Sequence, residues 1–205
     1  MIVTQITGIT KGRFRIYIEE KPAFVLYRGE VRRLGIREGE PLSEESLREI
    51  EEEILPTRAK RRAMNLLQNR DYTEAGLREK LRSGDYPESC IEEAVAYVKS
   101  YGYVDDCRYA GDFITYNLDR KSRTRMEQDL MRKGISKDTI RTVFEELEEQ
   151  GTSQDEGAMI RRLLEKKKYD PQTATGQEKQ RMYAFLYRRG FRAEVISRAL
   201  LLDIT

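Results

Sequence analysis

The chain has 205 residues, of which 36% are charged and 39% hydrophobic, and it contains neither tryptophan nor histidine. Without histidine it lacks the commonest general base, and its two cysteines, Cys90 and Cys107, cannot by themselves complete a four-ligand zinc site. Because 38 basic side chains balance 36 acidic ones, the net charge is only +2, and the molecule as a whole is not a polycation.

Nothing in the sequence indicates export or membrane insertion. The N-terminal segment lacks the apolar core of a signal peptide, and no apolar run approaches the roughly 18 residues that a spanning helix needs. We therefore expect a cytoplasmic protein with reduced cysteines and no membrane segment.

Residues 1–41 are expected to form a small β-rich segment. Phe14, Ile16 and Ile18 alternate with polar positions, which is the period of a strand. Pro22 breaks this run, and the following residues to Tyr27 read as a returning strand. The pattern predicts a hairpin, or a three-stranded sheet with residues 2–6 as the partner.

Residues 42–56 are expected to form a linking helix. Ser43 is a good N-cap, and Leu42 and Leu47 have the spacing of a hydrophobic staple. Pro56 is expected to end the helix, because proline removes a backbone donor and disfavours the helical conformation of the residue before it.

From Thr57 onward a pattern of three helices occurs three times. We assign the repeats to residues 57–119, with a last helix near 90–101 that leads into repeat two, 106–150 and 154–205. Each repeat begins with an apolar triple at i, i+3 and i+4: Ala63/Leu66/Leu67, Ala110/Phe113/Ile114 and Ile160/Leu163/Leu164. The second helices carry Leu77/Leu81, Met126/Leu130 and Met182/Leu186, and the third carry Ile91/Val95, Ile140/Phe144 and Ile196/Leu200. Such repetition predicts a mainly α fold of tandem three-helix repeats, about nine helices in an elongated curved array, after the β-rich segment.

Capping residues agree with these helices. Thr73 and Ser122 are placed to cap the second helices of repeats one and two. Gly134 and Gly190 stand where a helix C-terminus needs a positive φ, whereas the corresponding glycine of repeat one, Gly84, comes one position early.

Charge is segregated along the chain. Residues 120–134 carry six basic and two acidic side chains, residues 135–157 two and seven, and residues 158–192 ten and three. The first two helices of a repeat therefore tend to be basic and the third acidic. Ordinary solvated helix faces explain any single one of these charges, but recurrence also fits a basic stripe that faces a polyanion.

The stripe predicts a partner or DNA-binding surface, either for nucleic acid phosphates or for an acidic protein groove. Its candidate residues are Arg58, Lys60, Arg61, Arg62, Lys121, Arg123, Arg125, Arg132, Lys133, Arg161, Arg162, Lys166, Lys167, Lys168, Arg188 and Arg189.

Signals for an enzyme are weak. The sequence contains no phosphate-binding loop motif, and we expect no catalytic residue, cofactor or metal. Asp105 and Asp106 are adjacent carboxylates that could bind a metal ion in a nuclease, but a role in helix capping explains them equally. The tyrosines of the helical part fit packing better than base stacking, because most lie at helix ends or at core spacing.

Several segments resemble the RecX family of recombinase regulators. They are Arg62-Ala-Met-Asn-Leu-Leu through Arg70, Tyr72-Thr-Glu-x-x-Leu-x-x-Lys-Leu, Tyr101-Gly-Tyr-Val-Asp-Asp-x-Arg-Tyr-Ala110 and Arg125-Met-x-x-x-Leu-x-x-Lys-Gly-Ile135. The likeness spans residues 57–202, and one departure is a third repeat with little room for a long last helix.

The resemblance implies a non-enzymatic regulator, and we separately expect the chain to be a monomer. Members of that family bind the RecA recombinase, lie along the groove of the RecA–DNA filament, and suppress ATP hydrolysis and strand exchange; some also bind DNA. Two alternatives remain from the residues alone: a helical protein that binds single- or double-stranded nucleic acid without a recombinase partner, and a metal-dependent nuclease.

Overall fold

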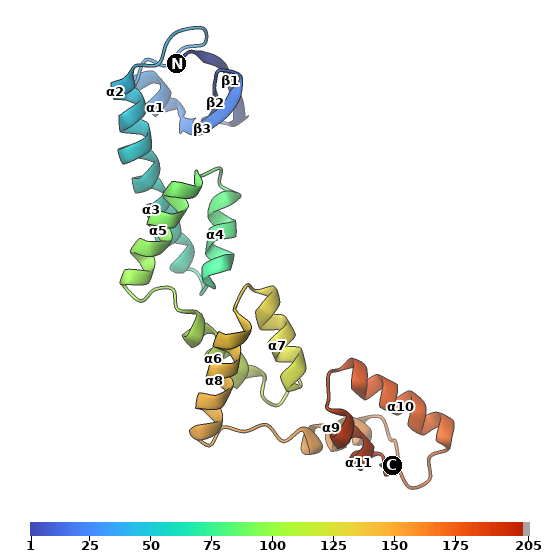
Figure 1. Ribbon diagram of the computed structural model, residues 1–205. Coiled ribbons are helices and arrows are strands. Elements are labelled where there is room, and N and C mark those ends of the chain that lie inside the picture. The colour runs from blue at the N-terminus through green and yellow to red at the C-terminus, as the bar shows by residue number, and fades with distance from the viewer. Residues whose placement is uncertain (203–205) are drawn as a thin grey trace. The chain divides into compact units, whose positions relative to one another are not determined.

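The computed structural model describes residues 1–202 and divides into two compact units, Met1–Asp105 and Asp106–Thr205 (Figure 1). Residues 203–205, the expected end of repeat three, lie outside the described part. Each unit is taken by itself below. No helix among residues 1–202 is both long and apolar enough to cross a membrane.

The first unit begins with a three-stranded antiparallel sheet, which confirms the expected β-rich segment. Its strands are β1 (Val3–Thr10), β2 (Arg13–Ile18) and β3 (Lys21–Tyr27), in the order β1-β2-β3. Ile16 of the central strand pairs with Ile6 and Phe24 and is fully buried. The short helix α1 (Arg28–Arg33) follows and packs against β3.

The next helix is continuous from Glu44 to Leu67, so the prediction that Pro56 ends it is wrong. It consists of α2 (Glu44–Arg48), the π-helical segment η1 (Glu49–Ile54) and α3 (Leu55–Leu67). The N–H of Leu55 bonds to the carbonyl of Ile50, five residues back rather than four. Pro56 has no backbone N–H to donate, and its ring needs space beside the preceding turn. The wider π turn directly before it accommodates both, so the helix continues.

Two further helices complete repeat one, and their apolar faces join the sheet in one core. They are α4 (Glu74–Arg82) and α5 (Glu88–Ser100), and the expected positions Leu77, Leu81 and Ile91 are fully buried. Thr73 caps α4 as predicted, since its side chain accepts a hydrogen bond from the N–H of Gly76 at 3.0 Å.

The second unit contains two bundles of three helices, each with its own core. The helices are α6 (Asp106–Asn117), α7 (Arg123–Arg132) and α8 (Lys137–Glu149), then α9 (Glu156–Lys166), α10 (Gly176–Arg188) and α11 (Ala193–Ala199). The predicted apolar positions meet inside each bundle: Met126 and Leu130 are fully buried in one, Ile160 and Leu186 in the other. The last helix is short, as the sequence led us to expect.

The second helix of every repeat ends in the same left-handed turn. Gly134 has φ +88° and Gly190 φ +81°, as predicted from their positions. In repeat one the equivalent residue is Asp85 rather than Gly84, with φ +63°. Aspartate is one of the few side chains that tolerates this conformation, and here Arg15 holds its carboxylate at 2.5 Å. The repeat is therefore in register despite the misplaced glycine.

Candidate polyanion-binding site

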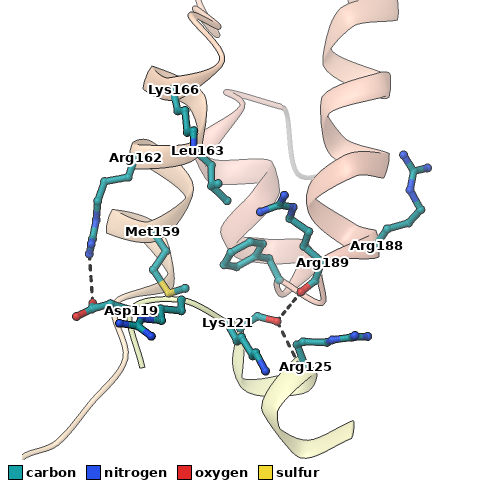
Figure 2. A pocket seen from close by; sticks show the side chains of 12 residues that line it. Asp119, Lys121, Arg125, Met159, Arg162, Leu163, Lys166, Arg188 and Arg189 are labelled. Atoms are coloured by element: carbon teal, nitrogen blue, oxygen red, sulfur yellow. Dashed lines mark hydrogen bonds and ion pairs between the residues drawn. The ribbon is translucent and has the colours of Figure 1, made fainter. Parts of the chain in front are cut away.

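A hollow of about 520 Å³ in the second unit is lined mainly by basic side chains. We call it the basic hollow. Its lining consists of Asp119, Arg120, Lys121, Ser122, Arg125, Met159, Arg162, Leu163, Lys166, Arg188, Arg189 and Phe191. Figure 2 shows Arg162 and Lys166 of α9 on one side, Arg188 and Arg189 at the end of α10 on the other, and the α6–α7 turn below. Repeats two and three thus both contribute to it.

A close backbone approach fixes the two sides of the hollow. The hydroxyl of Ser122 accepts from the N–H of Arg125 at 3.3 Å, which caps α7, and donates to the carbonyl of Arg189 at 2.6 Å. The neighbouring Gly190 leaves space for this contact, because a Cβ there would lie 2.8 Å from the Ser122 hydroxyl. A glycine in a left-handed turn and a buried serine cap therefore position the basic side chains.

The side chain of one glutamine, Gln154, holds the α6–α7 turn by hydrogen bonds. The side-chain amide of Gln154 donates to the carbonyl of Leu118 at 2.5 Å and to that of Lys121 at 2.6 Å. Both donors of the amide are used on a segment more than thirty residues away, so the linker before α9 ties repeat three to this turn. The sequence offered no periodic signal for this residue.

The basic side chains of the hollow differ in how far their charge is compensated. Arg162 pairs with Asp119 at 3.3 Å, and both side chains are well exposed. Lys121 and Arg125 reach Asp129 at 2.8 Å and 3.5 Å.

Four other cations of the hollow form no ion pair within residues 1–202. Lys166 and Arg188 extend from the helices as exposed side chains. Arg120 lies over the ring of Tyr116, and Arg189 lies over a phenylalanine ring on α10. Unpaired cations that converge on one hollow attract an anion with several charged groups more strongly than paired ones do.

Asp129 on α7 pairs with three basic side chains. Burial by itself raises the pKa of its carboxyl, but the hydrogen bond from Lys121 and its charge, the hydrogen bond from Arg132 and the charge of Arg125 together outweigh burial and hold that pKa below its ordinary value. Three cations share this single carboxylate, so α7 keeps a surplus of positive charge beside the hollow.

Six of the sixteen predicted stripe residues therefore converge on the hollow. They are Lys121, Arg125, Arg162, Lys166, Arg188 and Arg189. A seventh basic residue, Arg120, was not among the predicted ones, although it lies in the basic segment 120–134 and directly precedes Lys121.

The other predicted residues of the second unit do not line the hollow. Arg123 pairs with Glu127 and Glu148, Arg132 pairs with Asp129, and Arg161 lies 3.8 Å from Asp155. Lys133 and Lys167 lie over aromatic rings, and Lys168 is exposed just after α9.

Four predicted residues lie in the first unit, where Arg58 is engaged in packing. Its guanidinium pairs with Glu30 at 2.9 Å, donates to the Val25 carbonyl and lies over the ring of Tyr27. Lys60 pairs with Glu93 at 2.6 Å, while Arg61 and Arg62 are exposed.

The tyrosines are more exposed than the spacing suggested. Tyr101, Tyr116 and Tyr187 are each more than 60% exposed, although Tyr72 and Tyr86 pack against the core as expected. Tyr187 stacks on Tyr183 one turn earlier, with ring centroids 6.2 Å apart and nearly parallel planes. This pair on α10 directly precedes Arg188 of the hollow.

The described residues contain no cluster of three or more cysteine, aspartate and glutamate side chains that would hold a metal ion.

Comparison with known proteins identifies the repeats. Residues 59–97, 105–143 and 154–200 match the family models for the first, second and third three-helix domains of RecX. A crystal structure of a regulatory protein RecX shares the fold, with a TM-score of 0.63 and 21% identity over 97% of this chain and 98% of that one.

Two curated relatives match nearly the whole length. The regulatory protein RecX of Caldanaerobacter subterraneus subsp. tengcongensis is 31% identical over 202 residues, which cover 98% of both chains. That of Clostridioides difficile is 30% identical over 192 residues, or 92% of this chain and 88% of the relative. With three domain matches in order and this identity over its length, the chain belongs to the RecX family.

Proposed function

We propose that the protein regulates RecA by binding RecA and the RecA–DNA filament, and that it lowers the recombinase and ATPase activity of the filament. The family to which the chain belongs supports this role. The observation that carries the proposal to particular residues is the basic hollow, where Arg120, Lys166, Arg188 and Arg189 have no carboxylate partner within residues 1–202. In this proposal the chain acts in the cytoplasm by binding and performs no catalysis.

The physical basis is the sum of many modest contacts. A RecA–DNA filament repeats the same protein and phosphate surfaces, so a chain of three-helix repeats can engage several of them at once. Linked contacts of this kind raise the overall affinity without any single strong site. Phosphates add a term that weakens with salt, because their counterions are released on binding.

The primary test is a titration of the protein against RecA on single-stranded DNA, with ATP hydrolysis as the measurement. We expect inhibition that is complete near stoichiometric amounts. An ATPase rate that does not change at equal concentrations of the two proteins would contradict the proposal.

A pair of matched double variants tests the role of the hollow. Lys166→Gln/Arg188→Gln removes two unpaired charges, whereas Arg123→Gln/Arg132→Gln removes two charges that carboxylates already hold. If both hollow residues contact phosphates, the first variant needs roughly tenfold more protein for half-inhibition, since each contact is worth about fourfold at ~0.15 M salt. Equal losses in both variants would show that the whole basic stripe, rather than the hollow, makes the contact.

A second candidate function is direct binding of nucleic acid without a recombinase partner. The exposed Tyr187, stacked on Tyr183 beside Arg188, favours it, because an aromatic face next to a cation suits an unpaired base and its phosphate. Binding to a labelled single strand should then weaken with salt at a slope of roughly 0.7 per phosphate contact. The same measurement with and without RecA separates the two functions: only the first predicts that RecA strengthens retention on the strand.

A further inference from the structure

The strand β1 is an unprotected edge of the N-terminal sheet. Its sequence from Val3 to Thr10 contains no charged residue and no proline, and among the described helices and strands it alone has no charge. In a chain with 36% charged residues this is a marked local departure. Edge strands of natural proteins usually carry lysine, proline or a cover, because unpaired backbone groups invite another strand.

Only the first residues of this edge are covered. The N–H of Val3 donates to the carbonyl of Glu40 at 3.0 Å, and the N–H of Gly39 donates to the carbonyl of Val3 at 2.8 Å. From residue 4 to residue 10, no backbone hydrogen bond leads from β1 to any part of residues 1–202 outside the sheet. The open stretch is therefore seven residues long, with Thr7 at its centre.

The opposite edge of the same sheet is protected in each of the usual ways. The strand β3 begins with Lys21 and Pro22, and α1 packs against it. The guanidinium of Arg58 also bonds to the carbonyl of Val25. The contrast between the two edges shows that the openness of β1 is not a general property of this sheet.

We propose that the open edge of β1 pairs with β1 of a second copy of the chain. A two-fold axis perpendicular to the sheet makes such a pair antiparallel, so each strand supplies the same backbone groups to the other. A strand without charges is suited to itself, because no like charges come opposite each other.

The covered end of the strand sets the register. Pairing that avoids Val3 places Thr7 opposite Thr7, Ile6 opposite Gly8 and Gln5 opposite Ile9. In this register Lys11, the first charged residue after the strand, lies opposite Val3 of the second copy. Glu40 of that copy is next to this position, because its carbonyl accepts a hydrogen bond from the N–H of Val3. The termini of the open stretch are thus of opposite charge, which supports this arrangement over a shifted one.

The pairing is a weak and concentration-dependent one. Irregular pairing with β2 between Val3 and Gln5 and between Gly8 and Thr10 limits the regular part of β1. Such short contacts bury little surface and belong to the low end of protein interfaces. This proposal replaces the expectation of a monomer and does not depend on the proposed action on RecA. A dimer would bring six repeats to one filament.

Sedimentation equilibrium of the full chain tests the proposal. The apparent mass should be 24.1 kDa when dilute and rise toward twice that value as the concentration increases to several hundred micromolar, the range of weak interfaces. A mass that stays at the monomer value throughout that range overturns it, and so does growth past the dimer, because a two-fold pair of edges is closed.

A charge at the centre of the open stretch separates dimerisation from folding. In the monomer Thr7 lies opposite Arg15, which already pairs with Asp85, so Thr7→Glu adds a carboxylate beside a cation, and urea unfolding of this variant checks that the monomer keeps its stability. In the dimer the same change brings two glutamates together. We expect the dissociation constant of the dimer to rise roughly fivefold or more. An unchanged constant would remove β1 from the interface.

Cross-linking tests the register, in a Cys107→Ser background that removes the exposed native thiol. Thr7→Cys should give a disulfide-linked dimer under mild oxidation, because opposite residues of paired strands are within disulfide reach. Two Gln5→Cys residues would lie about 13 Å apart in this register and should not cross-link. Ala23→Cys on the protected edge is the second control, and equal cross-linking of all three variants overturns the proposal.

Discussion

The contact between repeats two and three predicts that Gly190→Ala destabilises the protein more than an equivalent change elsewhere. Gly151 is the matched control, because it also follows a helix end with φ +81°. A Cβ on Gly151 would meet no atom within 4 Å, whereas a Cβ on Gly190 would lie 2.8 Å from the hydroxyl of Ser122. The two substitutions thus share the backbone strain and differ in the contact.

The magnitudes follow from what each alanine disturbs. A left-handed alanine costs roughly 1–2 kcal/mol at either site. At Gly190 the new methyl group also displaces the Ser122 hydroxyl, which loses its bond to the Arg189 carbonyl, worth about 1 kcal/mol. Loss of the same hydroxyl as the cap of α7 costs about 1 kcal/mol more. We therefore expect Gly190→Ala to lower the free energy of unfolding by roughly 3–4 kcal/mol.

Urea unfolding followed by circular dichroism measures both variants, and a double-mutant cycle isolates the contact. In a Ser122→Ala background the hydroxyl is already absent, so Gly190→Ala should cost less than it does in the wild type, and the contacts of the new methyl group with Thr124 Cβ at 3.2 Å and Arg125 N at 3.4 Å should keep its cost above that of Gly151→Ala. If Gly190→Ala and Gly151→Ala lower the free energy of unfolding equally, the close approach of repeats two and three contributes nothing and the reasoning fails.

Three further predictions concern single carboxylates. Asp85→Ala should destabilise the first unit by about 2–3 kcal/mol, since alanine tolerates the left-handed conformation less well than aspartate and also loses the ion pair with Arg15, whereas Asp85→Gly should cost less; urea unfolding of both variants compares them. The lowered pKa of Asp129 means that this carboxylate stabilises the fold above its ordinary pKa and loses that effect as the pH falls through the lower folded value. The difference in unfolding free energy between the wild type and Asp129→Asn should therefore shrink below about pH 4, and a difference that is constant with pH would contradict the prediction. Asp119→Asn removes the one carboxylate among the described residues that line the basic hollow and should raise the affinity for single-stranded DNA severalfold at low salt, an effect that anisotropy titrations at low and high salt would reveal or exclude.

Much of the fold was predictable because its signals are local. Apolar residues spaced three and four apart, a threonine or serine before a helix and a glycine after it each act within one turn. Helix positions such as Leu77, Met126 and Leu186 were therefore found as core residues without any knowledge of their partners. The prediction that Pro56 ends its helix was wrong because the effect of a proline is not local: it depends on whether the preceding helical turn can widen.

The candidate site was predictable only in part. Charge segregation pointed to segments 120–134 and 158–192, which do supply the basic hollow. It did not distinguish Lys166, whose charge is unpaired, from Arg132, whose charge Asp129 holds. The sequence also did not predict the open edge of β1. A strand without charged residues indicates an open edge only once its neighbours in the sheet are known.

The repeat, the order of its helices, several capping residues and the β-rich N-terminal segment follow from the amino-acid sequence alone, because these depend on side chains within a few positions of one another. Which cations stay unpaired among the described residues, which two repeats share a hollow and which strand edge is open depend on the tertiary structure. Those properties arise from contacts between residues that are tens of positions apart, such as Ser122 with Arg189 and Arg58 with Val25. Long-range contacts of this kind are set by the packing of whole elements, and no local pattern encodes them.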